Sequence, residues 1–334
     1  MLRKVLILGA GSIGNHYANA SSELKLKTSV FDINIEALKR MKEEIFPARY
    51  GSWNQNIELL QDIPKNIDNE TLVILGTPPD VRKSLIHDCV NKGAEHILIE
   101  KPLSSPGEDL SFINEILNQN ISLYSGYNHP CSKAYASFKK LFDSQTINPN
   151  DIEEINVNWL ESWDGPLSAH FWMNSVFDSY LGYSEKGGGA MSEHSHGLNM
   201  GITFAKDMNI DFEFESVRLK WDHSNSYDEL FRCKLLNAMQ KRMTIVQDAV
   251  TSPAIKKLEV VGKDFTASLE FSSSKDLICI LQNNKEQKTE FIKSRAEDFI
   301  NNLDMITSNY KRAKDLFNNA IETQLIINEC WKNK

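Results

Sequence analysis

The chain opens with an apolar run that leads directly into a glycine-rich turn. Val5-Leu6-Ile7-Leu8 is followed by Gly9-Ala10-Gly11-Ser12-Ile13-Gly14 and then by residues typical of a helix. In a strand–turn–helix unit, the first glycine allows a tight reversal, the second admits a pyrophosphate against bare backbone, and the third lets the helix press on the strand. Backbone N–H groups at the helix start then face the phosphates. We therefore predict a dinucleotide site made by Gly9, Gly11, Ser12, Ile13 and Gly14.

Asp32 distinguishes between two forms of the cofactor. It ends a second predicted strand, residues 28–31, at the distance from the glycines where a ribose-binding carboxylate stands in this motif. A carboxylate accepts the ribose hydroxyls of NAD and repels the 2′-phosphate of NADP, and neither Ile33 nor Asn34 supplies the cation that NADP needs. We expect NAD rather than NADP. An ordinary turn followed by a surface aspartate is the alternative.

Length, charge and cysteine content exclude several classes of function. A chain of 334 residues predicts two domains. A net charge of −8, with no block of Lys and Arg, argues against nucleic acid as a partner. Five scattered cysteines without paired spacing indicate free thiols and no metal site. No apolar run reaches membrane-spanning length and no cleavable leader precedes the first strand, so we expect a cytoplasmic protein without membrane contact.

Strand and helix patterns alternate through residues 1–125. Further apolar runs at 72–75, 96–99 and 121–125 are separated by helical stretches, which predicts a doubly wound parallel sheet, an α/β Rossmann domain. Ligands bind at the carboxyl ends of such strands, so the turns after residues 75 and 99 should border the cofactor. These turns add Thr77, Pro78, Glu100 and Lys101 to the predicted cofactor-binding residues.

Residues 126–334 show a different pattern, with longer strands that follow one another. The predicted strands are 151–161, 215–222, 230–237, 242–249, 257–261, 267–271 and 277–282. They indicate an α+β domain with an open, mainly antiparallel sheet for substrate binding and oligomerisation, with helices over 133–142, 189–205 and 295–331. The last helices can pack back on the first domain. One face of the sheet stays free to form a homodimer or homotetramer.

Lys101 is the first candidate for a part in chemistry. It follows an apolar strand within Glu100-Lys101-Pro102, where a flexible ammonium can reach over a nicotinamide toward a substrate oxygen. An isolated triplet of this kind is more often a solvated turn. The predicted place beside the cofactor favours the chemical interpretation, in which Lys101 shares a hydroxyl proton with the substrate.

A second candidate group follows a run of three glycines. A glycine turn at 187–189 opens the predicted helix, and Glu193 and His196 fall three residues apart on one face of it. Histidine has an ordinary pKa of about 6.5, which suits proton abstraction from an alcohol, and Glu193 can orient it or bind a hydroxyl. His194 points elsewhere on a helix, which argues against joint metal ligation by the two histidines, but it competes with His196 as proton acceptor. A purely structural histidine is the alternative.

Together these motifs resemble the glucose-fructose oxidoreductase, inositol dehydrogenase and MocA family, written Gfo/Idh/MocA. The resemblance runs nearly end to end and includes the glycine motif, Gly76-Thr77-Pro78-Pro79, Glu100-Lys101-Pro102, Gly126-Tyr127-Asn128 and the three-glycine helix. It implies a Rossmann domain that binds NAD(P), an open antiparallel sheet, and a lysine and a histidine that flank a sugar or cyclitol. Under this resemblance Lys101 matches the family's lysine, Glu193 its usual aspartate and His196 its catalytic histidine.

The chain departs from the family's pattern at several positions. His196 follows the acid by three residues instead of the commoner four. Glu193 replaces an aspartate, and Asn199 stands where a sub-group has a second aspartate, which predicts altered recognition of substrate hydroxyls. Arg82 replaces a frequent histidine and Pro130 a frequent arginine. These departures indicate an atypical substrate.

An aromatic segment precedes the three glycines. Aromatic faces suit sugar rings, although the same side chains can simply pack a loop. Lys186 is the one Lys or Arg between Glu161 and Gly189, which favours a free sugar, cyclitol or sugar acid over a nucleotide sugar. The candidate substrate-binding residues are Asn128, Trp163, Trp172, His194 and Asn199.

The sequence therefore predicts an NAD-dependent dehydrogenase acting on CH–OH groups of a sugar-like substrate, with Lys101, His196 and Glu193 as catalytic residues. Two alternatives stay open. A redox-neutral enzyme would use tightly held NAD transiently, in elimination, glycoside cleavage or oxidoreduction between two sugars. A non-catalytic sensor would keep the nucleotide fold without the chemistry.

Overall fold

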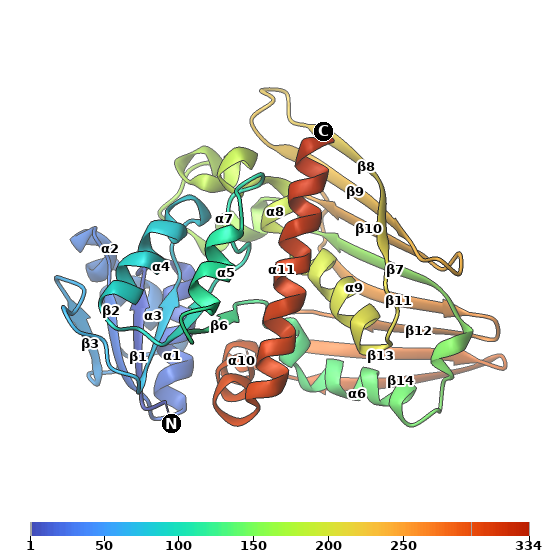
Figure 1. Cartoon of the computed structure of the whole chain (residues 1–334), viewed down its shortest axis with the longest axis horizontal. Helices are drawn as coiled ribbons and strands as arrows, with labels where there is room; N and C mark the ends of the chain where they lie inside the picture. Colours follow the sequence, from blue (N-terminus) through green and yellow to red (C-terminus); the bar gives the residue numbers. More distant parts are fainter. Residues whose placement is uncertain (1, 295, 334) are drawn as a thin grey trace. The chain divides into compact units, whose positions relative to one another are not determined.

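The computed structural model describes residues 2–294 and 296–333 (Figure 1). The chain forms two compact units. The first unit holds the chain up to Ser104, then Glu108–Asn128 and Ala296–Phe317. The second holds Ser105–Gly107, the chain from His129 to residue 294, and the described residues after Phe317. The first unit thus combines the N-terminal part of the chain with a segment from near its C-terminus.

The first unit is built on a six-stranded sheet in which every neighbouring pair is parallel. Its strands are β1 Lys4–Leu8, β2 Lys27–Phe31, β3 Ile57–Leu60, β4 Thr71–Leu75, β5 His96–Ile99 and β6 Ser122–Ser125. The order β3-β2-β1-β4-β5-β6 reverses at β1, so the carboxyl ends of β1 and β4 border the place where such sheets bind ligands. The predicted doubly wound sheet is confirmed, and β3 adds an edge strand that the sequence pattern did not indicate.

Helices follow the strands of this unit. They are α1 Ser12–Glu23, α2 Ile35–Arg40, α3 Phe46–Tyr50, α4 Arg82–Asn91, α5 Ser111–Leu117 and α10 Glu297–Ser308, with a π-helical turn at Met41–Ile45 and a 3-10 turn at Pro79–Val81. Helix α1 packs on β1, β2 and α10. Asn34 caps α2, since its side chain accepts the Glu36 N–H at 3.0 Å. Apolar side chains of β1, α1 and β4 form the core beneath these helices.

The second unit is built on an eight-stranded sheet, in the order β14-β13-β12-β11-β7-β10-β9-β8. Its strands are β7 Ile152–Leu160, β8 Glu213–Trp221, β9 Asp228–Leu236, β10 Arg242–Asp248, β11 Ile255–Gly262, β12 Phe265–Glu270, β13 Lys275–Gln282 and β14 Lys285–Ile292. The β7–β10 pair is parallel and the other pairs are antiparallel. The predicted mainly antiparallel sheet is confirmed. Strand β14 escaped prediction because it is charged and almost wholly exposed, as edge strands often are.

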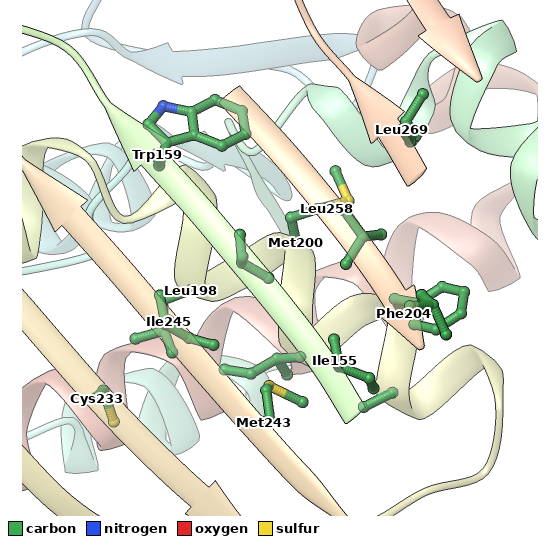
Figure 2. Close-up of a cluster of buried hydrophobic side chains, with 14 of the residues drawn as sticks. Ile155, Trp159, Leu198, Met200, Phe204, Cys233, Met243, Ile245, Leu258 and Leu269 are labelled. Atoms are coloured by element: carbon green, nitrogen blue, oxygen red, sulfur yellow. The ribbon is translucent and has the colours of Figure 1, made fainter. Parts of the chain in front are cut away.

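Helices cover one face of this sheet. Helix α9, His196–Asp207, packs on β7, β10 and β11, and α6, Lys133–Asp143, packs on β12 and β13. Figure 2 shows the resulting core, in which Leu198, Met200 and Phe204 of α9 meet alternate residues of the strands, among them Ile155 and Leu258. Side chains alternate along a strand, so every second residue of β7 faces away from this core. Those residues are half exposed.

Two helix predictions need correction. The helix predicted over 189–205 is two helices, α8 Gly189–Glu193 and α9, because the Gly197 N–H donates to the His194 carbonyl at 3.0 Å, a tighter turn than an α-helix makes. Glu193 and His196 therefore do not share a face of one regular helix. The helix predicted over 295–331 divides into α10 and α11, Tyr310–Lys332, and its first residue, Arg295, lies outside the described residues.

Short helical turns complete the second unit. They are α7 Asp164–Ala169 and the 3-10 turns His129–Cys131, Pro149–Asp151, Val176–Asp178, Tyr180–Gly182 and Ser184–Lys186. All five cysteines are free thiols. Within the two described ranges, the helices are all too short or too polar to cross a membrane.

Candidate functional site

The turn between β1 and α1 has the geometry that a bound pyrophosphate requires. Gly9 has a φ of +110°, a conformation that side chains disfavour, and a Cβ on Gly14 would lie 2.0 Å from the Gly9 carbonyl oxygen. A Cβ on Gly11 would instead meet no described heavy atom within 4 Å. Gly11 also caps α1 without a side chain. The turn is thus tightly packed on its protein side and open where phosphate would approach the helix N-terminus.

Asp32 is tied to this turn by hydrogen bonds. Its Oδ2 accepts the Ala10 N–H at 2.7 Å and its Oδ1 accepts the Asn34 N–H at 2.8 Å. Each carboxylate oxygen can accept a second hydrogen bond, so both remain able to receive a ribose hydroxyl. The backbone bonds fix the position of the carboxylate relative to the glycines.

A cavity of about 470 Å³ lies beside this carboxylate. Its lining comprises Leu8, Gly9, Gly11, Phe31, Asp32, Ile33, Gly76, Thr77, Pro78, Val81, Ser84 and Leu85. Ile33 is 91% exposed and offers an apolar surface next to the carboxylate, and the buried Thr77 Oγ1 has no hydrogen-bond partner in the described part of the chain. Apolar walls with a few polar groups suit a nucleotide, so these residues fit the predicted cofactor.

Lys101 and Glu100 follow β5 in the same unit and are buried; Lys101 is 7% exposed. The Glu100 carboxylate accepts the Lys101 N–H at 3.0 Å and the Tyr17 hydroxyl at 3.0 Å. Burial raises the pKa of the Glu100 carboxyl, while the charges of Lys101 and Arg82 act to lower it. Glu100 therefore holds the backbone of Lys101 from inside the protein.

Asp228 of β9 holds the start of α8 in the second unit. Gly188 caps this helix without a side chain, and Asp228 Oδ2 accepts the Met191 N–H at 2.6 Å in place of an N-cap. Its Oδ1 accepts the Ser184 hydroxyl at 2.6 Å. Burial raises the pKa of Asp228 to about 7, against the hydrogen bonds that lower it. The sequence pattern did not indicate Asp228, because this residue lies far from the glycines along the chain.

The predicted acid and one predicted histidine lie at the end of α8. The Tyr180 hydroxyl donates to Glu193 Oε2 at 2.9 Å. The ring of His194 stacks on Trp163, with centroids 5.6 Å apart and planes 27° apart. Three residues that the sequence singled out, Trp163, Glu193 and His194, thus form two contacting pairs with Tyr180 and with each other.

His196 lies in a different aromatic setting. Its ring stacks on Trp159 at 5.6 Å and meets the ring of His129 edge-on, with centroids 4.7 Å apart. His129 also contacts the rings of Trp159 and Phe271. His129 was not among the predicted site residues, although it follows Gly126-Tyr127-Asn128 directly. His194 is buried and His196 is partly exposed, so the two candidates for proton acceptor differ in access.

The other predicted substrate-binding residues are placed separately. Asn128, at the end of the first unit, is 5% exposed, and its Oδ1 has no hydrogen-bond partner among the residues described. Trp172 contacts the rings of His170 and Phe171. The Asn199 amide donates to Thr323 Oγ1 at 3.0 Å and so ties α9 to α11, and its contact with substrate stays a prediction. In the part of the chain that the structure describes, no group of three or more His, Cys, Asp or Glu could hold a metal ion.

Comparison with known proteins agrees with this fold. Residues 3–125 match the model of an oxidoreductase family, GFO_IDH_MocA, described as an NAD-binding Rossmann fold. Residues 3–125 thus match the NAD-binding domain of the Gfo/Idh/MocA oxidoreductases. This match agrees with the resemblance drawn from the sequence and with the predicted NAD-binding Rossmann domain.

Several solved structures share the fold of this chain. KijD10, a 3-ketoreductase from Actinomadura kijaniata in complex with NADP and TDP-benzene, is 12% identical with a TM-score of 0.76, over 100% of this chain and 98% of that one. Levoglucosan dehydrogenase in complex with NADH and levoglucosan is 14% identical with a TM-score of 0.74, over 100% and 98%. The dehydrogenase MviM from Clostridium difficile is 15% identical with a TM-score of 0.70, over 99% of both chains. Among curated proteins, none matches this chain in sequence.

Two glycine substitutions separate packing from nucleotide contact. Gly14→Ala places a methyl group against the Gly9 carbonyl, so we expect a loss of about 1–3 kcal/mol in the free energy of unfolding. Gly11→Ala places its methyl in open space, so stability should hold while the Kd for NAD rises at least about tenfold. Thermal unfolding and titration calorimetry measure the two effects. Unchanged NAD affinity in Gly11→Ala would contradict the predicted phosphate site.

The raised pKa of Asp228 predicts that the free energy of unfolding depends on pH. Its ordinary pKa of 3.8 in the unfolded chain rises to about 7 in the folded one, so the folded state binds more protons between these values. The contribution of Asp228 to the free energy of unfolding therefore falls as pH rises through this window. In Asp228→Asn, the change in unfolding free energy from about pH 5 to about pH 8 should differ from wild type by about 2–3 kcal/mol, with the Asp-specific decline removed.

Urea unfolding at a series of pH values measures this difference. The exposed Asp62→Asn is the matched control and should keep the wild-type dependence on pH. If Asp228→Asn also keeps it, the raised pKa of Asp228 is wrong.

Proposed function

We propose that this chain is an NAD-dependent oxidoreductase that interconverts a secondary hydroxyl and the corresponding ketone of a sugar, cyclitol or sugar derivative. The observation that carries the proposal is the cavity whose walls include the open Gly11 turn and the anchored Asp32 carboxylate. When bound there, NAD supplies the nicotinamide carbon that exchanges a hydride with substrate. The residues of the chain supply binding, orientation and proton transfer.

The anchored Asp32 supports NAD over NADP. Backbone N–H groups hold its carboxylate in place at the cavity wall, where a 2′-phosphate would bring a second negative charge. Of the compared proteins, KijD10 was crystallised with NADP and levoglucosan dehydrogenase with NADH, so the fold accommodates either cofactor in those proteins. The choice in this chain rests on Asp32.

Three side chains take the proposed catalytic roles. Lys101 hydrogen-bonds the reacting oxygen and stabilises charge that develops there, since a buried ammonium interacts more strongly than a solvated one. His196 takes the hydroxyl proton, a role for which the partial exposure of its ring gives access. Glu193, held by the Tyr180 hydroxyl, binds a neighbouring substrate hydroxyl or orients the histidine.

The substrate class follows from the same residues and from the compared proteins. The ring of His194, which follows Glu193 in the chain, stacks on Trp163, and aromatic faces next to polar groups suit sugar rings. One of the compared proteins is a 3-ketoreductase with TDP-benzene and another binds levoglucosan, a sugar without a nucleotide. Lys186 is the one Lys or Arg between Glu161 and Gly189, so this segment has no arginine to bind the diphosphate of a nucleotide sugar. The proposed substrate is therefore a free sugar, cyclitol or sugar acid.

The proposal extends to domains and assembly. Residues 1–125 bind the nucleotide, and residues 126–334 bind the substrate and form a homodimer or homotetramer through the sheet face that helices leave open. Trp172 and Asn128 complete the proposed substrate contacts. A cytoplasmic location fits the free thiols of all five cysteines.

Lys101→Ala tests the proposed chemistry. We expect kcat to fall by about 10²-fold or more, because the reacting oxygen loses its charged donor, while the Kd for NAD changes by less than about threefold. The measurement is NADH formation by purified protein over a panel of sugars, cyclitols and sugar acids, with NAD affinity measured separately. Equal turnover in Lys101→Ala would remove this lysine from the mechanism. Product without net NADH would establish the redox-neutral alternative, and no product with any compound would favour the sensor.

Matched histidine substitutions identify the proton acceptor. His196→Gln should lower kcat by about 10²-fold and abolish its acidic limb, because Gln cannot accept the hydroxyl proton. His194→Gln should raise the KM through lost stacking on Trp163 while the pH profile of kcat persists. Steady-state kinetics from about pH 5 to about pH 9 measures both. The reverse result would identify His194, not His196, as the residue that accepts the hydroxyl proton.

A further inference from the structure

Arg82 is the first residue of α4 and is only 3% exposed. Its guanidinium donates to the carbonyls of Glu100 and Pro102 through Nη1, and to that of Lys101 at 3.5 Å through Nη2. Nε and Nη2 also donate to the Thr77 carbonyl, at 2.9 and 2.6 Å. A guanidinium carries five N–H donors, and these five contacts use each of them once.

Burial of the Arg82 guanidinium has a free-energy cost that its contacts must offset. Burial removes the guanidinium from water, and the N-terminus of a helix repels positive charge, so both effects disfavour Arg82 at this position. The four backbone carbonyls compensate through their dipoles. They belong to the chain after β4 and the chain after β5, which are neighbouring strands. Arg82 therefore joins the turn that lines the nucleotide cavity to the segment that carries Lys101.

The same segment is also held from its other side. Glu100 accepts the Lys101 N–H, and the Tyr17 hydroxyl lies within hydrogen-bond distance of Glu100 Oε1, at 3.0 Å, and of Asn302 Oδ1, at 3.1 Å. Asn302 donates in turn to the Ser125 carbonyl at 3.3 Å. The Lys101 peptide thus has its carbonyl side held by Arg82 and its N–H side held by Glu100.

We propose that Arg82 is a positioning residue that fixes the Lys101 backbone against the nucleotide-binding turn, so that the side chain of Lys101 starts from one defined position. The inference rests on the proposed function, in which Lys101 contacts the reacting oxygen. Arg82 itself contacts backbone carbonyls and acts through Lys101. Its partners explain why this chain has arginine where its family frequently has histidine, because a histidine ring offers at most two donors.

Lysine cannot replace this arrangement. The three N–H donors of lysine all belong to one nitrogen atom. They cannot reach carbonyls spread over two segments, as the planar guanidinium of arginine does. Arg82→Lys therefore keeps the charge and loses the bridge, whereas Arg82→Met loses both. Lys83→Met is the matched control, since Lys83 is the next residue of α4 and is exposed.

The charge of Arg82 has an effect of its own. The groups that face the Glu100 carboxyl are Arg82 of α4, Lys101 and the Tyr17 hydroxyl of α1, and the two cations act to lower the pKa of Glu100 against burial, which raises it. Removal of one cation raises this pKa further, so Glu100 ionises only at higher pH. Arg82→Met should therefore move the ionisation of Glu100 to higher pH and Arg82→Lys should leave it in place, a difference that loss of stability alone would not cause.

The experiment compares wild type with the three variants by kcat, KM, NAD affinity, thermal unfolding and acylation of Lys101 followed by mass spectrometry. We expect Arg82→Lys to fold, to lose about 30-fold or more in kcat with a KM within about threefold of wild type, and to acylate Lys101 at least about threefold faster. Lys83→Met should match wild type throughout. Wild-type kcat and wild-type acylation in Arg82→Lys would overturn the proposal, even if Arg82→Met fails to fold.

Chemical acylation of Lys101 can be measured without a sugar substrate. It therefore tests this inference separately from the proposed function. If wild-type protein oxidises no compound but Arg82→Lys acylates Lys101 faster, the positioning role stands and the proposed function fails. If wild type is active and Arg82→Lys retains both kcat and slow acylation, the proposed function stands and the positioning role fails.

Discussion

The close approach of α1 to the first turn is the constraint on which the first unit depends. A Cβ on Gly14 would lie 2.0 Å from the Gly9 carbonyl oxygen, so the helix rests directly on the backbone of the turn. Tyr17 lies one helical turn beyond Gly14, and its hydroxyl reaches Glu100, which holds the Lys101 N–H. The glycine motif thus shapes the nucleotide cavity. It also fixes the position of Tyr17, which contacts Glu100 and through it holds the backbone of Lys101.

The two units solve one structural problem in the same way. Glycine-rich turns provide no side chain to bind nearby backbone N–H groups, and in both units a carboxylate from elsewhere in the sheet accepts one of them, in the turn before α1 and in the first turn of α8. Asp32 binds Ala10 and Asp228 binds Met191. The environments differ, because Asp32 borders a cavity whereas burial raises the pKa of Asp228 to about 7. The first carboxylate is available to a ligand, and the second serves the protein alone.

The local patterns of the sequence were sufficient for most of the fold. The glycine spacing, Asp32 and the alternation of strands and helices follow from backbone geometry and predicted the parallel sheet. The break between Glu193 and His196 did not follow, because it depends on how Gly197 packs: a Cβ there would lie 2.8 Å from the Trp159 Cβ. Asp228 and His129 were missed for a related reason. Their partners lie far away in the chain, and only the tertiary fold brings them together.

Departures from a family pattern acquire meaning from the partners of each side chain. Arg82 suggested an altered substrate in the sequence, yet its guanidinium binds only backbone carbonyls in the contacts described above. Asn199 donates to Thr323, which likewise gives it a partner inside the protein. Glu193 differs from both, since its carboxylate accepts the Tyr180 hydroxyl from a loop rich in aromatic residues. Of these three departures, the proposed recognition of an atypical substrate therefore rests on Glu193 with Tyr180.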